Sequence, residues 1–334
     1  MWSVTLANRM SRKQSLLVAL LFSTWFVTSL ARAENNAASW LDKMSHAVKE
    51  TDYQGVLVFG NSMAWQTLSI GHMVVEGIEY EKIVHLTGDP REVIRIGQET
   101  IHTHPGDHAV RYHETAVGNI ANNLRDNIAQ IQKHYSLSLA GQSRVAGRMT
   151  QEVLVVPKDR HRYGHKLWLD AESGLLLRSD LLGERDKVLE RYQFASISIG
   201  TRLPFSEFDA SGRGHRVAPP LESSVSSEAL SWLPKWIPEG FQRTAQKHAM
   251  GRSSMMYSDG LSAFSVFVES ATDKPMPDMT NRWGATSAVV MNRVNGGKLF
   301  RITLVGELPL KTARKIAGSV KKTPEKAPSS AGVQ

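Results

Sequence analysis

Short runs in which apolar and polar residues alternate follow one another along the first part of the chain, and this pattern constrains the fold more than any other feature. Such runs cover residues 54–59, 66–75, 78–86, 92–96 and 99–104. Pieces rich in Gly, Pro, Asn, Asp and Ser separate several of them. A period of two is typical of a half-buried strand, and links of hairpin length cannot form the crossovers of a parallel sheet. The pattern therefore predicts an antiparallel meander.

A second series of strands follows after a helical pattern. These strands are expected at residues 143–147, 151–157, 165–170, 175–179 and 188–199. Gly174 lies in the link of the clearest hairpin, where the chain needs a positive φ. Apolar residues at helical spacing predict amphipathic helices at 37–50 and 119–135. A sheet with this many strands should curl around a helix or into a partial barrel, so the predicted fold class is α+β.

The first 33 residues have the pattern of a secretory signal peptide. Arg9, Arg12 and Lys13 precede an uncharged apolar run over 16–30, and residues 31–33 form an Ala-Arg-Ala triplet that predicts cleavage after Ala33. An uncleaved membrane anchor is the alternative, but it needs about 20 apolar residues and this run has roughly 15. The segment holds four basic residues and no acidic residue, so cleavage lowers the net charge from +8 to +4.

Export narrows the classes of function. Nucleic acid is not expected as a partner of an exported chain with this charge, and the mature sequence has neither of the glycine-rich nucleotide-binding motifs. The chain contains no cysteine, so disulfides, thiolate nucleophiles and Cys-ligated metals are excluded. It also lacks the G-x-S-x-G motif of a nucleophilic serine. We predict no catalytic residue, no enzyme activity and no cofactor; an envelope hydrolase remains a minor alternative.

A change in composition divides the mature chain. Residues 206–231 are rich in Gly, Pro and Ser and are expected to form a linker. Strands are then expected at 260–269, with Leu261, Ala263, Ser265 and Phe267 on one face, and at 285–293 and 298–306, before a closing helix at 310–320. The predicted organisation is a signal peptide (1–33), a large domain (34–205), a linker (206–231), a small domain (232–321) and a disordered tail (322–334).

Three groups of residues are candidate binding sites. His102, His104, His108 and His113, with Asp107, have a spacing that a metal could use, but they surround a strong turn that needs no metal. A basic cluster is a candidate for contact with an anionic lipid, or else a solvated loop; its members are Lys158, Arg160, Arg162 and Lys166. Aromatic residues at the start of the small domain are candidates for partner binding, or else for its core; they are Trp232, Trp236 and Phe241.

Two stretches of the sequence resemble the MucB/RseB family of periplasmic regulators of sigma-E. The first covers residues 157–170 and 173–179. The second comprises residues 236–241, 257–261, 264–267, 284–286, 302–309 and 312–313. The similarity extends from about Trp40 to Val320, which is nearly the whole mature chain.

The resemblance implies both a fold and a role. The large domain should be an unclosed antiparallel barrel packed on helices, like the lipoprotein carriers LolA and LolB, and the small domain should be α+β. The chain should bind the periplasmic domain of a membrane anti-sigma-E factor, mainly through its small domain (232–321), and protect it from site-1 proteolysis. Envelope stress signals, such as lipopolysaccharide or the acyl chains of a lipid sensed by the large domain, should relieve that protection. A periplasmic carrier of lipids or lipoproteins is the alternative, and a homo-oligomer is left open.

Overall fold

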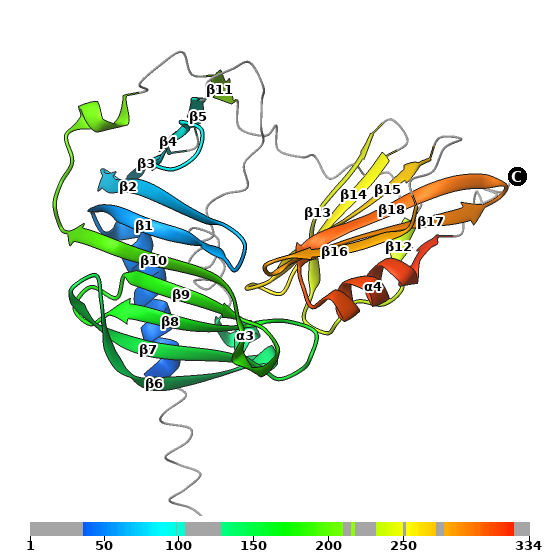
Figure 1. Cartoon of the computed structure of the whole chain (residues 1–334), viewed down its shortest axis with the longest axis horizontal. Helices are drawn as coiled ribbons and strands as arrows, with labels where there is room; N and C mark the ends of the chain where they lie inside the picture. The colour runs from blue at the N-terminus through cyan, green and yellow to red at the C-terminus, as the bar shows by residue number, and fades with distance from the viewer. Residues whose placement is uncertain are drawn as a thin grey trace, which may run out of the picture.

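The computed structural model describes residues 36–97, 99–103, 128–209, 215–217, 232–249, 252–271 and 277–323. The predicted signal peptide lies outside these residues, as do most of the predicted linker and all but the start of the predicted tail. Figure 1 shows two β-sheet units beside one another. We call the described residues up to 217 the large domain and those from 232 the small domain. Among the described residues, no helix has the length and apolar composition needed to cross a bilayer.

Eleven antiparallel strands form the sheet of the large domain, in the order β11-β5-β4-β3-β2-β1-β10-β9-β8-β7-β6. Two meanders, β1 to β5 and β6 to β10, join where β1 pairs with β10. The outermost strands β11 and β6 do not pair with each other, so the sheet as described is unclosed. The strands are β1 (Tyr53–Asn61), β2 (Trp65–Val75), β3 (Ile78–His85), β4 (Glu92–Ile96), β5 (Glu99–Thr103), β6 (Tyr135–Val145), β7 (Arg148–Pro157), β8 (Gly164–Asp170), β9 (Leu176–Leu182), β10 (Val188–Ile199) and β11 (His215–Val217).

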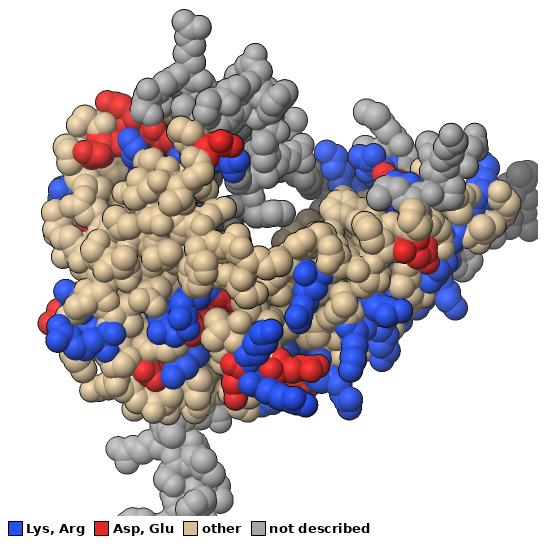
Figure 2. All heavy atoms as spheres, in the orientation of Figure 1, with Lys and Arg blue, Asp and Glu red and all other residues tan. Residues whose placement is uncertain are grey.

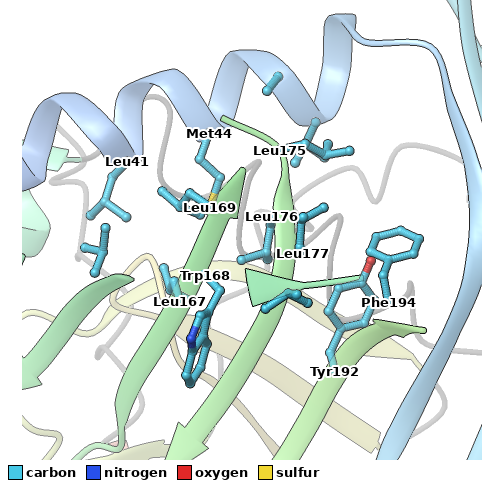
Figure 3. Packing of buried hydrophobic residues seen from close by; sticks show 14 of the residues in the cluster. Leu41, Met44, Leu167, Trp168, Leu169, Leu175, Leu176, Leu177, Tyr192 and Phe194 are labelled. Atoms are coloured by element: carbon cyan, nitrogen blue, oxygen red, sulfur yellow. The ribbon is translucent and has the colours of Figure 1, made fainter. Parts of the chain in front are cut away.

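A helix over residues 36–50 packs on one face of this sheet and supplies the centre of its core. Leu41 and Met44 are fully buried one turn apart, and Figure 3 shows them directed at Leu169 and its neighbours on β8 and β9. The apolar residues that recur at helical spacing and those that alternate along the strands therefore pack against each other in a single apolar layer. This arrangement confirms the predicted α+β class and the unclosed sheet packed on helices.

Local sequence explains where the main chain turns. Gly174 in the β8–β9 link has φ +83°, and a Cβ at this position would also strike the side chain of Lys43. Glycine therefore permits both the turn and the close approach of the first helix. Of the helix predicted over 119–135, the structure describes α3 (Ile128–His134), in which Ile131 is fully buried.

Part of the predicted linker belongs to the large sheet. The 3-10 helix η2 (Phe205–Phe208) buries Phe208 in a cluster with Met73 and Ile94. Residues 215–217 form β11, which pairs with β5. Three backbone pairings at a sheet edge need no apolar side-chain pattern, so composition gave no signal for this strand. A second 3-10 helix, η1 (Glu184–Asp186), connects β9 with β10.

The small domain has a six-stranded antiparallel sheet in the order β13-β14-β15-β18-β17-β16. Helix α4 (Leu310–Ser319) covers one face with Ala313, Ile316 and Ala317. The strands are β13 (Gln242–Ala249), β14 (Arg252–Ser258), β15 (Ala263–Ser270), β16 (Met279–Trp283), β17 (Thr286–Asn295) and β18 (Lys298–Glu307), with β12 (Trp232–Pro234) and β19 (Val320–Lys322) as a separate pair.

The alternation predicted within 260–269 is present in β15. The residues buried beneath α4 are Phe264, Val266 and Val268, whereas Phe267, on the face with Ala263 and Ser265, is exposed. Strand β13 was not predicted, because its run of Gln, Arg, Thr and Lys residues shows no apolar period. Strands at the edge of a sheet need less apolar surface and leave a weaker signal.

The contact between the first helix and the sheet should carry much of the stability of the large domain. We expect Met44→Ala to lower the free energy of unfolding by about 2–4 kcal/mol, because it leaves a cavity in a fully buried site. Met63→Ala is the matched control, since Met63 is 65% exposed. Chemical denaturation measures both changes, and an equal effect of the two variants would contradict the packing described.

Candidate functional site

The two domains meet in a junction, and some of the residues singled out from the sequence lie in it, among them Arg162, Trp236 and Phe241. From the large domain come the β7–β8 turn (residues 158–163) and residues of β10. From the small domain come the β14–β15 turn, the β16–β17 turn and the first turn of α4. These contacts determine which surfaces of the two domains remain exposed.

A buried ion pair lies at the centre of the junction. Arg162 of the large domain places its Nη1 atom 2.7 Å from Oδ2 of Asp259 in the small domain, and both side chains are fully buried. The Arg162 guanidinium also donates to the carboxylate of Asp159 and to the backbone carbonyl of Glu239. A buried ion pair is tolerated only when its remaining donors and acceptors are bound, and here they are.

Asp259 is held as firmly as its partner. Its Oδ1 atom accepts hydrogen bonds from the backbone amides of Leu261 and Ser262, which fixes the β14–β15 turn. Its Oδ2 atom also accepts a hydrogen bond of 3.0 Å from the hydroxyl of Tyr135. Burial, followed by the charge of Asp259, raises the pKa of Tyr135 well above its ordinary value, so this hydroxyl keeps its proton and remains a donor.

Aromatic rings enclose the guanidinium. The Cζ atom of Arg162 lies 5.5 Å from the ring centre of Tyr135 and 5.1 Å from that of Phe241. One ring comes from each domain. The planar, weakly hydrated guanidinium suits such an enclosed position better than an ammonium would. Ion pairing and ring contacts therefore act on the same side chain.

The β16–β17 turn forms a second contact. Gly284 has φ +58°, and a Cβ there would collide with Glu190 and Asn61 of the large domain. The next residue, Ala285, is fully buried, and its amide donates a 2.9 Å hydrogen bond to Oε1 of Glu190. Nearby, the hydroxyl of Tyr163 donates to the carbonyl of Leu308. Only glycine allows the turn to approach the large domain this closely.

A third contact joins the β7–β8 turn to α4. Nδ1 of His161 lies 3.1 Å from Oγ1 of Thr312 in the first turn of the helix. The His161 ring also meets the edge of Trp236, and Nζ of Lys315 lies 3.6 Å from the centre of the same indole ring. Trp236 is therefore held between the two domains.

Burial at the junction shifts the pKa values of two carboxyl groups and a histidine. Burial raises the pKa of Glu307 to about 7, with a further contribution from the charge of Glu190. Burial also raises the pKa of Glu190. His165 is buried with neither ring nitrogen bonded, and burial lowers its pKa to about 4, so it stays neutral. The junction thus favours the uncharged form of Glu307.

The structure gives the four predicted lipid contacts different surroundings. The Arg162 side chain is inaccessible to a ligand, because the junction encloses it. Lys166 pairs with Glu152 at 2.9 Å and lies over the Trp168 ring. Lys158 and Arg160 are exposed. Contact with an anionic lipid therefore remains a prediction for the exposed pair.

The three residues predicted to bind a partner also differ in their surroundings. Trp232 and Phe241 are buried in the core of the small domain, where Trp232 packs against Phe300 and Phe241 against Phe264. This agrees with the core alternative for both. Trp236 is half-buried at the junction, so partner binding stays a prediction for this residue.

The predicted histidine group lies mostly outside the described residues. Only His102 falls on a described strand, β5, while His104, Asp107, His108 and His113 do not. Within the part of the chain that the structure describes, no group of three or more His, Asp or Glu residues could hold a metal ion.

An apolar surface that the sequence pattern does not reveal lies beside the junction. The β1–β2 turn approaches Gly284 through Asn61, and it exposes Met63 and Trp65. Trp283 follows on the small-domain side, at the end of β16, and is 46% exposed. We call Met63, Trp65 and Trp283 the junction rim. These residues lie on separate strands, one or two on each, so no sequence pattern links them and only the fold brings them together.

Strand β16 ends at the rim and offers a second feature. All five of its residues are exposed, and among the described strands it pairs with β17 alone. Its outer backbone groups can therefore accept a further strand, and an extended peptide can pair with such an edge.

Comparison with known proteins covers nearly all of the chain. Residues 36–211 match the MucB/RseB N-terminal domain, and residues 226–321 match the MucB/RseB C-terminal domain. The sigma factor AlgU regulatory protein MucB of Pseudomonas aeruginosa is 32% identical over 326 residues, which cover 91% of this chain and 96% of that protein. The sigma-E factor regulatory protein RseB of Escherichia coli K12 is 27% identical over 316 residues, with 89% and 97% covered.

Solved structures show the same similarity. The complex of Pseudomonas aeruginosa MucA and MucB contains a chain that is 29% identical, with a TM-score of 0.74 over 87% of this chain and 100% of that one. A crystal structure of MucB by itself is 28% identical, with a TM-score of 0.62 over 86% of this chain and 98% of that one.

Removing one member of the central ion pair should destabilise the protein strongly. We expect Arg162→Met to lower the free energy of unfolding by about 3–5 kcal/mol, because it leaves Asp259 buried without its cation. The double variant with Asp259→Asn should recover most of this loss. Arg144→Met is the control, since Arg144 is exposed and bonds only to the carbonyl of Gly147. Additive effects of the two substitutions in a double-mutant cycle would contradict the coupling.

The pKa of Glu307 predicts how stability depends on pH. The value is about 7 in the folded chain against 4.5 for an ordinary Glu, so the folded chain binds more protons between these values. Stability should therefore fall as the pH rises from 4.5 through 7, by at most about 3 kcal/mol. Glu307→Gln should flatten this dependence and the exposed control Glu184→Gln should not, as measured by thermal unfolding across the pH range.

Proposed function

The chain belongs to the MucB/RseB family, and from this membership we propose that it is a regulatory binding protein of the periplasm. Its partner is the periplasmic domain of a membrane anti-sigma-E factor, which it protects from site-1 proteolysis. Envelope stress signals relieve the protection. The role is non-catalytic: the chain acts by covering a protease-sensitive segment, which requires affinity and geometry but no reactive group.

The similarity to a MucB solved in complex with MucA carries this proposal. That relative matches over its full length and includes both domains. The TM-score is also higher for the MucA-bound relative than for MucB by itself. We propose on this basis that the docked arrangement of the two domains described above is the one that receives the partner.

The junction rim and the free edge of β16 are the surface that best suits a protein partner. Trp65 and Trp283 offer large, rigid aromatic area, and residues of this type contribute a large share of the free energy at protein interfaces. The edge of β16 supplies backbone donors and acceptors in a row. An extended segment of the partner can pair with β16 while its side chains contact the rim on both domains. In such a complex, that segment would be withdrawn from a protease.

Release requires a second arrangement of the domains. The large domain (34–205) receives the signal, the linker (206–231) permits movement, and the small domain (232–321) holds the edge strand. A lipid or lipopolysaccharide that binds the large domain better in the undocked arrangement lowers partner affinity by that difference in binding free energy. Opening must break the Arg162–Asp259 pair, so the two arrangements are discrete.

A carrier of lipids or lipoproteins is the alternative, and one set of measurements separates the two functions. The mature protein should bind the purified periplasmic domain of the anti-sigma factor from the same organism and slow its cleavage by the site-1 protease. A carrier would instead move a labelled lipid from donor to acceptor vesicles without slowing cleavage. Absence of both binding and protection would exclude the regulator.

The rim gives a specific prediction for partner affinity. We expect Trp283→Ala to weaken binding of the anti-sigma periplasmic domain by about 2 kcal/mol, because it removes an exposed aromatic side chain from the centre of the proposed surface. Val294→Ala is the matched control, since Val294 is 73% exposed in the same sheet but belongs to the far end of β17. Calorimetric titration compares the two, and equal affinities would place the partner elsewhere.

A further inference from the structure

The small domain carries a concentrated positive charge, most of which takes no part in the junction or the proposed partner surface. Residues 232–321 contain 13 Lys and Arg and 6 Asp and Glu, whereas residues 34–205 contain 19 and 21. The basic excess of the mature chain therefore belongs to the small domain. Figure 2 shows Lys and Arg along the lower side of this domain, over α4.

Helix α4 presents one uniformly basic face. Its buried positions are Thr312, Ala313, Ile316 and Ala317, and its exposed positions other than Gly318 are basic. Lys235 at the end of β12 and the two lysines of β19 extend this face, because β12 pairs with β19 directly after α4. We call these six exposed residues the basic strip: Lys235, Lys311, Arg314, Lys315, Lys321 and Lys322.

The charges of the strip are uncompensated. Many basic residues of the large domain bind carboxylates, for example Arg95, Arg148 and Arg191. None of the six strip residues forms an ion pair with a described residue. The contact of Lys315 with the Trp236 ring leaves its charge in place.

The arrangement also opposes the stability of the helix. Lys311 lies in the first turn of α4, which contains no acidic residue, and there its charge is unfavourable with the helix dipole. Lys311 also repels Arg314, three residues on, and Lys315, four residues on. Charges that weaken the fold locally and remain unpaired indicate an external anion.

From these observations we propose that the basic strip binds the surface of an anionic phospholipid bilayer. No residue of α4, β12 or β19 is a large exposed hydrophobic side chain, so the strip has no anchor of the kind that protein interfaces use. Five of its six members are lysines, whose flexible ammonium groups suit mobile lipid headgroups, whereas arginine favours bidentate recognition of fixed carboxylates. Basic side chains adjacent to an anionic membrane each add to the attraction, within a Debye length.

The junction extends the strip into the large domain. Arg160 is exposed next to His161, which contacts Thr312 of α4. The docked arrangement therefore presents basic residues of both domains together, and one of them is a residue that sequence analysis had proposed as a lipid contact. The strip and the junction rim share no residue.

Vesicle co-sedimentation of the mature protein tests the proposal. We expect binding to vesicles that contain phosphatidylglycerol, no binding to phosphatidylcholine alone, and loss of binding at high salt. Combined Lys311→Gln, Arg314→Gln and Lys321→Gln should weaken binding at least about tenfold, since each basic residue near an anionic surface contributes on the order of 1 kcal/mol. These substitutions spare Lys315 and its contact with Trp236.

The control is a second triple variant that removes the same number of positive charges from positions outside the strip. Lys187→Gln, Lys247→Gln and Lys298→Gln change three exposed lysines outside the strip and should leave vesicle binding unchanged. Equal weakening by both triple variants, or full binding by the strip variant, would overturn the proposal, as would binding of polyglutamate in preference to vesicles. Unchanged melting and unchanged binding of the anti-sigma domain by the strip variant should show that its fold and the proposed function are intact.

Discussion

The ion pair between Arg162 and Asp259 is the interaction on which the arrangement of the two domains depends. Two opposite charges without access to water are stable only together, so the docked arrangement requires Arg162 and Asp259 at once. The surrounding rings and hydrogen bonds make the same contact directional, because Arg162 must reach Asp259, Asp159 and the carbonyl of Glu239 at once. Such a junction has a docked and an undocked state, and intermediate arrangements of the domains are sparsely populated.

That property links the fold to regulation. A partner segment that pairs with β16 and touches both sides of the rim would bind only when the domains are docked, so any ligand that favours undocking would reduce partner affinity. Glu307 and Glu190 add a dependence on pH to the same junction, since their charged forms are disfavoured there. The basic strip shares no residue with the junction rim, so the two proposed surfaces use different side chains.

Much of the fold could be predicted from residue patterns because its determinants are local. The helix over 36–50, the hairpin at Gly174 and the closing helix α4 each follow from spacing within a dozen residues. The strands without an apolar period, β13 and β11, left no such signal. The site was less predictable: Arg162 was singled out for its charge, but an arginine in a basic run is indistinguishable by sequence from its exposed neighbours Lys158 and Arg160.

The sequence by itself therefore determined the α+β class and the resemblance that led to the family, and it predicted an export signal and a two-part organisation. Only the tertiary structure decided which side chains are free to bind. Asp259 is 97 positions from Arg162 and Trp283 is more than two hundred from Trp65, and no periodicity spans such distances. Burial and pairing are properties of the folded chain, because they depend on which residues the backbone brings together. A basic side chain therefore forms a fixed structural contact at Arg162, whereas basic side chains on α4 stay exposed and available to a ligand.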